Sequence, residues 1–130
     1  MDRWSNVRNE RGSGVVEFAL VLPILAILTV AIMDFSLAMW SQHTLASAAR
    51  DGARYATIRQ ATDDEITQKV KDSAFGLTPS KMEVLLTFDP NREPGSTVHI
   101  TVRYPFDPVT PFVPARRVTL EASADMVVLR

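Results

Sequence analysis

Hydrophobic residues are concentrated in one run near the N-terminus. No charged residue stands between Phe18 and Met33, and the apolar pattern resumes after Asp34 as far as Trp40. A helix rises about 1.5 Å per residue, so residues 15–40 are long enough to cross a hydrocarbon core of about 30 Å. A chain this small has too little other core to surround such a helix on all sides. The pattern therefore predicts a transmembrane span over about 15–40 rather than the buried helix of a soluble domain.

A cleaved secretory signal peptide is another interpretation of an N-terminal apolar run. Residues 46–48 (Ala-Ser-Ala) resemble the small-x-small cleavage site of such peptides. The run is longer than a usual signal core, and this site lies well past its end. A retained span is therefore favoured.

The flanks of the span predict its orientation. Residues 1–12 are polar, carry no periodic pattern and predict a flexible leader. Their basic side chains, Arg3, Arg8 and Arg11, favour a cytoplasmic N-terminus. Arginines also follow the span and weaken this asymmetry, but long trailing domains cross largely regardless of charge. We therefore expect residues after about 41 to lie outside the cytoplasm.

The helical pattern continues beyond the span and predicts one long helix over 13–60. Pro23 lies within its first half, removes one backbone donor and predicts a kink or a loosened turn. The second half is amphipathic, with apolar positions three or four residues apart. These positions are Leu45, Ala49, Ala53 and Ala56.

Residues 61–130 predict a small domain of one helix and three strands. The helix is expected over about 63–75, because Thr62 or Asp63 can cap it and Gly76 can end it. Its sparse apolar side is formed by Ile66, Val70 and Phe75.

The alternating pattern that follows predicts strands. They are expected over 82–88, 97–106 and 116–129, with turn residues in 89–96 and a proline-rich loop in 107–114. The third strand can bulge or change face near Ala124. Three antiparallel strands need a cover for their apolar face, which the short helix or the outer half of the long helix can supply. The fold class predicted is α+β: a long N-terminal helix, a short helix and a three-stranded antiparallel sheet.

Composition removes several classes of function. The formal net charge is −1, which argues against nucleic acid as the main partner. There is no cysteine, and neither His43 nor His99 has a metal-ligand spacing. The residues from Asp89 onward alternate loosely like a calcium loop, but prolines intrude and the twelfth position is Ile100 rather than a glutamate. We therefore expect no metal site, cofactor, catalytic site or small-molecule substrate.

An acidic residue at the edge of the span is the most informative feature. Glu17 directly precedes Phe18, the first residue of the uncharged run. A charge at the centre of a membrane helix costs about 2.5–3.5 kcal/mol, and less near an interface. Glu17 therefore needs a partner or a place near the headgroups. A free α-amino group made by cutting after Gly12 would be a suitable cation.

Gly12, four intervening residues, Glu17-Phe18 and a long apolar helix together resemble the cleavage signal of type IV prepilins. The resemblance implies that prepilin peptidase cuts after Gly12 on the cytoplasmic side and that Ser13 becomes the new N-terminus. It also implies that Glu17 pairs with the amino terminus of a neighbouring subunit.

A second stretch narrows the family. The span sequence over 11–28, the acid-aromatic pair Asp34-Phe35, and ASAARDGARYAT (46–57) are similar to TadE-like proteins of tight-adherence (Flp-type) pilus systems. This resemblance covers residues 11–58 strongly. The downstream helix motif consists of Ala48, Ala49, Arg50, Gly52, Ala53, Arg54, Tyr55 and Ala56.

This motif has two interpretations. Arg50 and Arg54, one turn apart, can form a solvated face or rest near lipid headgroups. Alternatively, the small residues let another helix approach closely. The docking set is then Ala49, Arg50, Gly52, Ala53, Arg54, Tyr55 and Ala56.

The resemblance implies a minor pseudopilin, because main Flp subunits lack an appended sheet domain. Its expected place is the inner membrane, with residues 1–12 cleaved and residues 61–130 in the periplasm. Its implied partners are other pilins and pseudopilins, prepilin peptidase and the inner-membrane assembly platform. The alternative is an uncleaved, signal-anchored binding or sensing domain; a secreted enzyme has almost no support among the residues.

Overall fold

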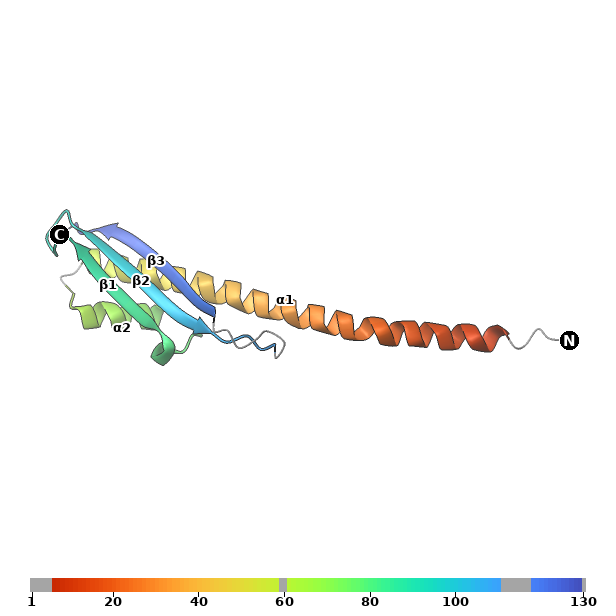
Figure 1. The fold of residues 1–130 in the computed structure, drawn as a ribbon. Helices are drawn as coiled ribbons and strands as arrows, with labels where there is room; N and C mark the ends of the chain where they lie inside the picture. Colours follow the sequence, from red (N-terminus) through yellow and green to blue (C-terminus); the bar gives the residue numbers. More distant parts are fainter. Residues whose placement is uncertain (1–5, 59–60, 111–117, 130) are drawn as a thin grey trace.

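The computed structural model describes residues 6–58, 61–110 and 118–129. A long helix carries a small domain at the end away from the N-terminus (Figure 1). The fold is α+β, as predicted, with the strands in an antiparallel three-stranded sheet. The elements are α1 (Asn6–Ile58), α2 (Asp63–Ser73), the 3-10 turn η1 (Pro79–Lys81), β1 (Glu83–Asp89), β2 (Thr97–Phe106) and β3 (Val118–Val127).

Helix α1 contains 53 residues, which corresponds to a length of about 80 Å. It begins at Asn6, so residues 6–12 are helical rather than irregular as expected for a leader. No proline interrupts this stretch, and the hydrogen-bonded ladder of the span continues into it. The helix also continues through Pro23. Its expected end at residue 60 lies outside the described residues.

Helix α2 begins as its sequence predicts. Thr62 is the N-cap and forms a capping box with Glu65: the Glu65 amide donates to Thr62 Oγ1, and the Thr62 amide donates to Glu65 Oε2 at 2.9 Å. Ile66 and Val70 are fully buried. Phe75 was expected on the same side but is 86% exposed. The helix ends at Ser73, so helical spacing no longer determines where Phe75 points.

Gly76 follows this helix end in the left-handed region, with φ +81°. A side chain there would also collide with α1, because an ideal Cβ would lie 2.5 Å from Trp40 Cη2. Glycine is therefore required twice at this position, for its backbone conformation and for the close approach of the Trp40 ring.

The sheet has the strand order β1-β2-β3. Val98, Ile100 and Val102 are buried on one face of β2, as the alternation predicts. The pairing of β2 with β3 continues residue for residue from Thr97 opposite Val127 to Phe106 opposite Val118. Because no residue is inserted, the bulge considered near Ala124 does not form. The expected strand start at 116 lies outside the described residues.

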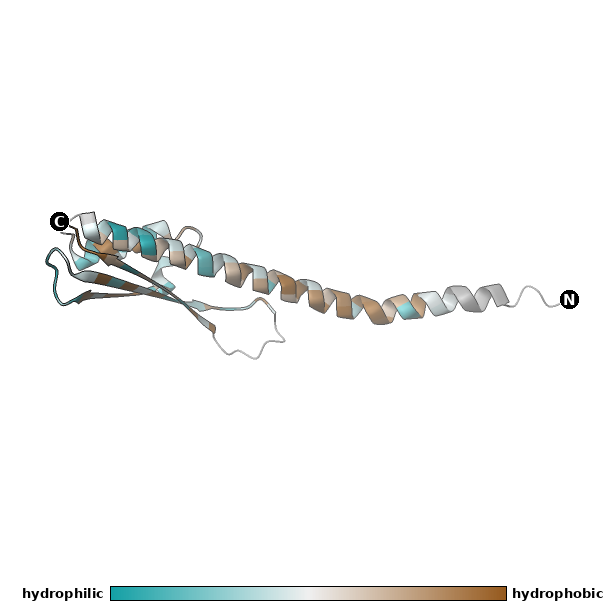
Figure 2. Cartoon of the chain, turned by 90° about the horizontal axis from the view of Figure 1, so that it is seen from above, coloured by the Kyte–Doolittle hydropathy of each residue, from teal (hydrophilic) through white to brown (hydrophobic). Residues whose placement is uncertain are grey.

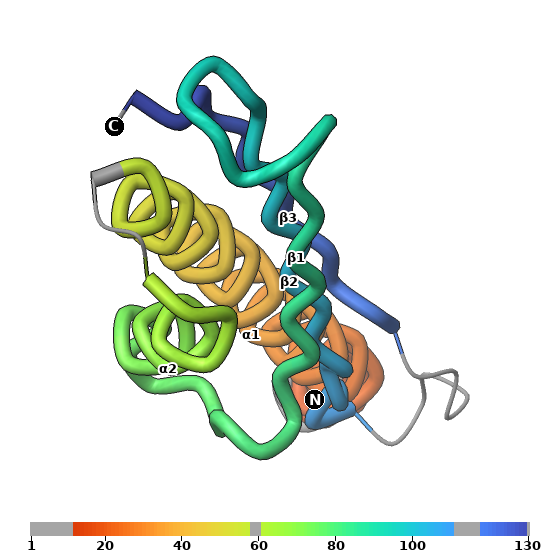
Figure 3. Tube along the Cα trace, turned by 90° about the vertical axis from the view of Figure 1, so that its left-hand side faces the viewer, coloured from red at the N-terminus to blue at the C-terminus, as the bar shows by residue number. Residues whose placement is uncertain are grey.

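The domain has two layers, the sheet and a pair of helices (Figure 3). The C-terminal half of α1 covers the buried face of the sheet, and α2 packs mainly against α1. Small residues of α1 permit this close packing, since an ideal Cβ on Gly52 would lie 2.3 Å from Val70 Cγ2 of α2. The core includes Leu45, Ala48, Ala49, Ala53, Ile66, Val70, Val98, Ile100, Val102, Ala122 and Ala124.

Candidate functional site

The N-terminal half of α1 extends away from the domain with its apolar side chains exposed. Its most apolar window has a mean hydropathy of 2.7 and is 0% buried within the chain. Figure 2 shows the hydrophobic stretch along the part of α1 that the domain does not cover. Val15 is 69% exposed and Leu20 is 70% exposed. A helix with this surface needs lipid or other helices around it, and it is long and apolar enough to cross a membrane.

Two carboxylates frame the uncharged part of this helix. Glu17 and Asp34 are separated by about 26 Å along α1, close to the thickness of a hydrocarbon core. Each acid therefore falls near an edge of a span that is placed on the uncharged residues. Their surroundings within the chain are different.

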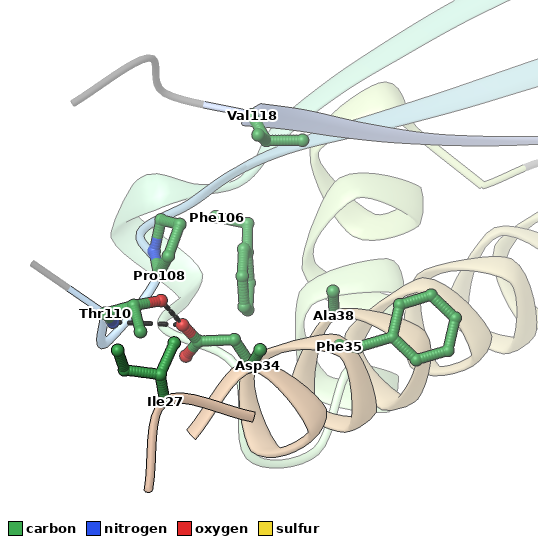
Figure 4. A pocket seen from close by; sticks show the side chains of 9 residues that line it. Ile27, Asp34, Phe35, Ala38, Phe106, Pro108, Thr110 and Val118 are labelled. Carbon is green, nitrogen blue, oxygen red and sulfur yellow. Dashed lines mark hydrogen bonds between the residues drawn. The ribbon is translucent and has the colours of Figure 1, made fainter. Parts of the chain in front are cut away.

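Asp34 is satisfied inside the chain. Its side chain is buried, and its carboxylate accepts the backbone amides of Val109 at 2.9 Å and Thr110 at 3.0 Å. The Thr110 hydroxyl donates to the same carboxylate (Figure 4). Hydrogen bonds to an ionised acceptor are stronger than those between neutral groups. Asp34 therefore ties Val109 and Thr110, which follow β2, to the helix at the C-terminal end of the uncharged run.

Glu17 is exposed on α1, and the salt bridges of the described residues do not include it. Phe18 beside it is 63% exposed. Gly12 and Ser13 are also exposed and lie in the helix one to two turns before Glu17. Neither Gly12 nor Gly14 has a neighbouring atom within 4 Å of an ideal Cβ. The predicted processing and assembly residues thus lie together on a part of the helix that contacts no other described element.

The predicted docking residues divide into two groups. The small ones, Ala49, Gly52, Ala53 and Ala56, are buried against the sheet and α2 of the same chain. A second helix does approach them closely, but it is α2. Within this chain, the face proposed for a partner is therefore already occupied. The accessible members of the set are Arg50 and Arg54, which are exposed, and Tyr55, which is half-buried.

The outer face of the sheet is polar. His99 Nδ1 lies 2.7 Å from Asp125 Oδ1, and Arg103 Nε donates to Glu121 Oε2 at 2.7 Å. The hydrogen bond to Glu121, followed by the charge of Glu121, raises the pKa of Arg103. Within the described residues, no three His, Asp or Glu side chains are grouped so that they could hold a metal ion.

Sequence reasoning did not assign a role to Asp34 beyond its place in the family pattern. Its hydrogen-bond partners, Val109 and Thr110, are 75 and 76 residues away along the chain. The available signal was an acid directly after an uncharged run, which requires compensation. Nothing in that signal indicates which distant segment supplies the donors.

Within the described residues, these observations define a protein with one helix of membrane-spanning character that continues into a small α+β domain. Residues 12–54 match the TadE-like protein family, and this confirms the family resemblance over those residues. The match and the apolar helix fit a membrane protein associated with tight-adherence pili. Neither the curated proteins nor the solved structures contain a match to this chain.

Proposed function

We propose that this protein is a minor pseudopilin in the biogenesis of a tight-adherence (Flp-type) pilus. The observation that carries the proposal is the contrast between two acids on one apolar helix. Asp34 receives its hydrogen bonds from the chain's own Val109 and Thr110, whereas Glu17 is exposed and unpaired among the described residues. A carboxylate at the edge of a membrane span calls for a compensating cation, and another molecule can supply it.

Cleavage after Gly12 would create that cation. The new α-amino group of Ser13 has an ordinary pKa of about 7.7–8.0 and is largely protonated at neutral pH. Two unit charges 4 Å apart attract by about 4 kcal/mol at an effective dielectric constant of 20. The same amine also lies about one helical turn from Glu17 of its own chain. Pairing between chains is therefore the point that an experiment has to establish.

The proposed location is the inner membrane, with the N-terminus cytoplasmic and the α+β domain periplasmic. The basic residues of the leader support this orientation. The span and Glu17 would pack with other pilins and pseudopilins on the assembly platform after prepilin peptidase has removed residues 1–12. In this role the protein is a structural component: it needs no catalytic residue, cofactor, nucleic acid or small-molecule substrate.

Mass spectrometry of the membrane-extracted protein tests the processing step. We expect an N-terminus at Ser13 in cells that contain the peptidase, and an uncut chain for Gly12→Val. Gly14→Val is the matched control, because Gly14 also lies in open surroundings on α1 and this variant should be trimmed normally. An intact Met1 in the wild-type protein would instead favour an uncleaved, signal-anchored binding domain.

Crosslinking between chains in membranes tests the assembly role of Glu17. Glu17→Ala should still be cleaved but should crosslink several-fold less to pilin-like partners. Glu17→Asp keeps the charge and should restore part of the crosslinking. Wild-type crosslinking by the cleaved alanine variant would show that Glu17 does not pair with a neighbouring subunit.

A further inference from the structure

A pocket lies between α1 and the residues at the end of β2, just after it and at the start of β3 (Figure 4). Its helical wall contains Ile27, Ala31, Asp34 and Ala38, which recur at the three- and four-residue spacing of one helix face. Ala31 and Ala38 contribute single methyl groups and leave space at this face. Its volume is about 370 Å³. The opposite wall consists of Phe106, Pro108, Thr110 and Val118.

The lining of this pocket calls for an apolar guest. Apart from Asp34 and Thr110, the side chains are hydrocarbon or aromatic. The Asp34 carboxylate already accepts the Thr110 hydroxyl and two backbone amides. The polar groups of the lining therefore bond to one another, and a guest with its own polar groups would lose its hydration without compensation.

The position of the pocket along α1 indicates where the guest comes from. From Ile27 to Ala38 the pocket extends about 16 Å along the helix. Ile27 and Ala31 belong to the uncharged run, whose most apolar window is 0% buried. In a membrane-inserted chain, the end of the pocket at Ile27 and Ala31 is thus continuous with the helix surface that faces hydrocarbon. Asp34 and its bonded Thr110 lie in the lining between Ile27 and Ala38.

We propose that the pocket holds one acyl chain of a phospholipid from the outer leaflet of the membrane. A lipid chain is elongated, apolar and present at high concentration at this depth. A partner helix has a diameter of about 10–12 Å with its side chains and is too wide for a space of this volume between α1 and the loop. The bound chain would fill the hollow that Ala31 and Ala38 leave, and it would support the contact between the domain and the span.

Photocrosslinking tests this proposal on the full-length protein in nanodiscs. The probe is a phosphatidylglycerol with a diazirine in its acyl chain, mixed into phosphatidylethanolamine. We expect labels on Phe106 and Val118 as well as on the exposed span, because both side chains line the pocket. Val118 is 46% exposed, so the loss of its label when the pocket is filled is part of the test. Labels on the span alone would overturn the proposal, and so would a protein partner crosslinked at Phe106 or Val118 in place of lipid.

A filled pocket provides the matched comparison. Ala38→Phe should reduce labelling of Phe106 and Val118 at least fivefold. Ala26→Phe places the same side chain on another face of α1, outside the pocket lining, and should leave their labelling unchanged. Equal labelling in the two variants would contradict the proposal. The wild-type label pattern does not depend on whether either variant folds.

The inference rests on the membrane insertion that is part of the proposed function, but the two can fail separately. Without insertion, neither the span nor the pocket is labelled. With insertion and an empty pocket, the span is labelled and Phe106 and Val118 are not. Cleavage after Gly12 and pairing of Glu17 require insertion but do not depend on whether the pocket is filled.

Discussion

Gly52→Ala probes the closest helix contact of the domain. An added Cβ would lie 2.3 Å from Val70 Cγ2 and 3.3 Å from Ile100 Cδ1. Both neighbours are fully buried, and valine is stiff about χ1, so α2 has to move away from α1. Overpacking of this kind costs about 1–3 kcal/mol, and so short an approach belongs to the upper part of that range. The greater helix propensity of alanine offsets about 1 kcal/mol of this cost.

The free energy of unfolding of the domain should therefore fall by about 1–2 kcal/mol. For a domain of this size, the midpoint of thermal unfolding should fall by roughly 4–16 °C. The measurement is tryptophan fluorescence of the full-length protein in detergent micelles. The chain has two tryptophans, so a Trp4→Phe background leaves Trp40 as the reporter. Its ring contacts the segment after α2 at Gly76.

Two further variants separate the steric effect from a general effect of alanine. Gly14→Ala meets no atom within 4 Å and should not lower the unfolding midpoint. Val70→Ala removes the atom that is too close, so Gly52→Ala should cost less in that background than in the wild type. If Gly52→Ala proved as stable as the wild type, or if its cost were the same in both backgrounds, the close contact between α1 and α2 would be refuted.

Three other substitutions test individual contacts. Asp34→Ala leaves two loop amides without their acceptor, so the free energy of unfolding of the domain should fall by about 1–3 kcal/mol. Hydrogen exchange of those amides should accelerate, and unchanged exchange would refute the contact. Gly76→Ala forces a positive φ on alanine and a collision with Trp40, so it should destabilise by at least about 1 kcal/mol and shift Trp40 emission. Thr62→Ala removes the cap of α2 and should cost about 1 kcal/mol in chemical denaturation, unlike an exposed control, Ser47→Ala.

Local patterns predicted most of the fold. The alternating pattern over 97–106 predicted β2, and the structure buries Val98, Ile100 and Val102 on one face because each strand residue points opposite to the next. Thr62, one of the two caps considered, identified the start of α2, and the structure adds its capping box with Glu65. These features depend on neighbours in the chain, so the sequence contains the whole signal.

Contacts between distant segments were beyond such patterns. The small residues around Gly52 predicted a close helix approach but not that α2 would be the helix. Phe75 was assigned to an apolar side that ends with α2 at Ser73. Asp34 was recognisable as an acid in need of partners, yet its donors come from a loop 75 residues further on. Spacing along the chain shows that a residue such as Asp34 needs a partner, whereas only the packed structure shows which residue that partner is.

The continuity of α1 from the span into the core of the domain has a mechanical consequence. From Pro23 to Ile58 the helix is about 52 Å long, so a change in tilt of 10° at Pro23 moves the far end by about 9 Å. With Asp34 holding the loop after β2 against the same helix, the domain follows this movement as one body. A small rearrangement among packed helices inside the bilayer would thus become a large displacement at the distal surface, as at the end of a lever.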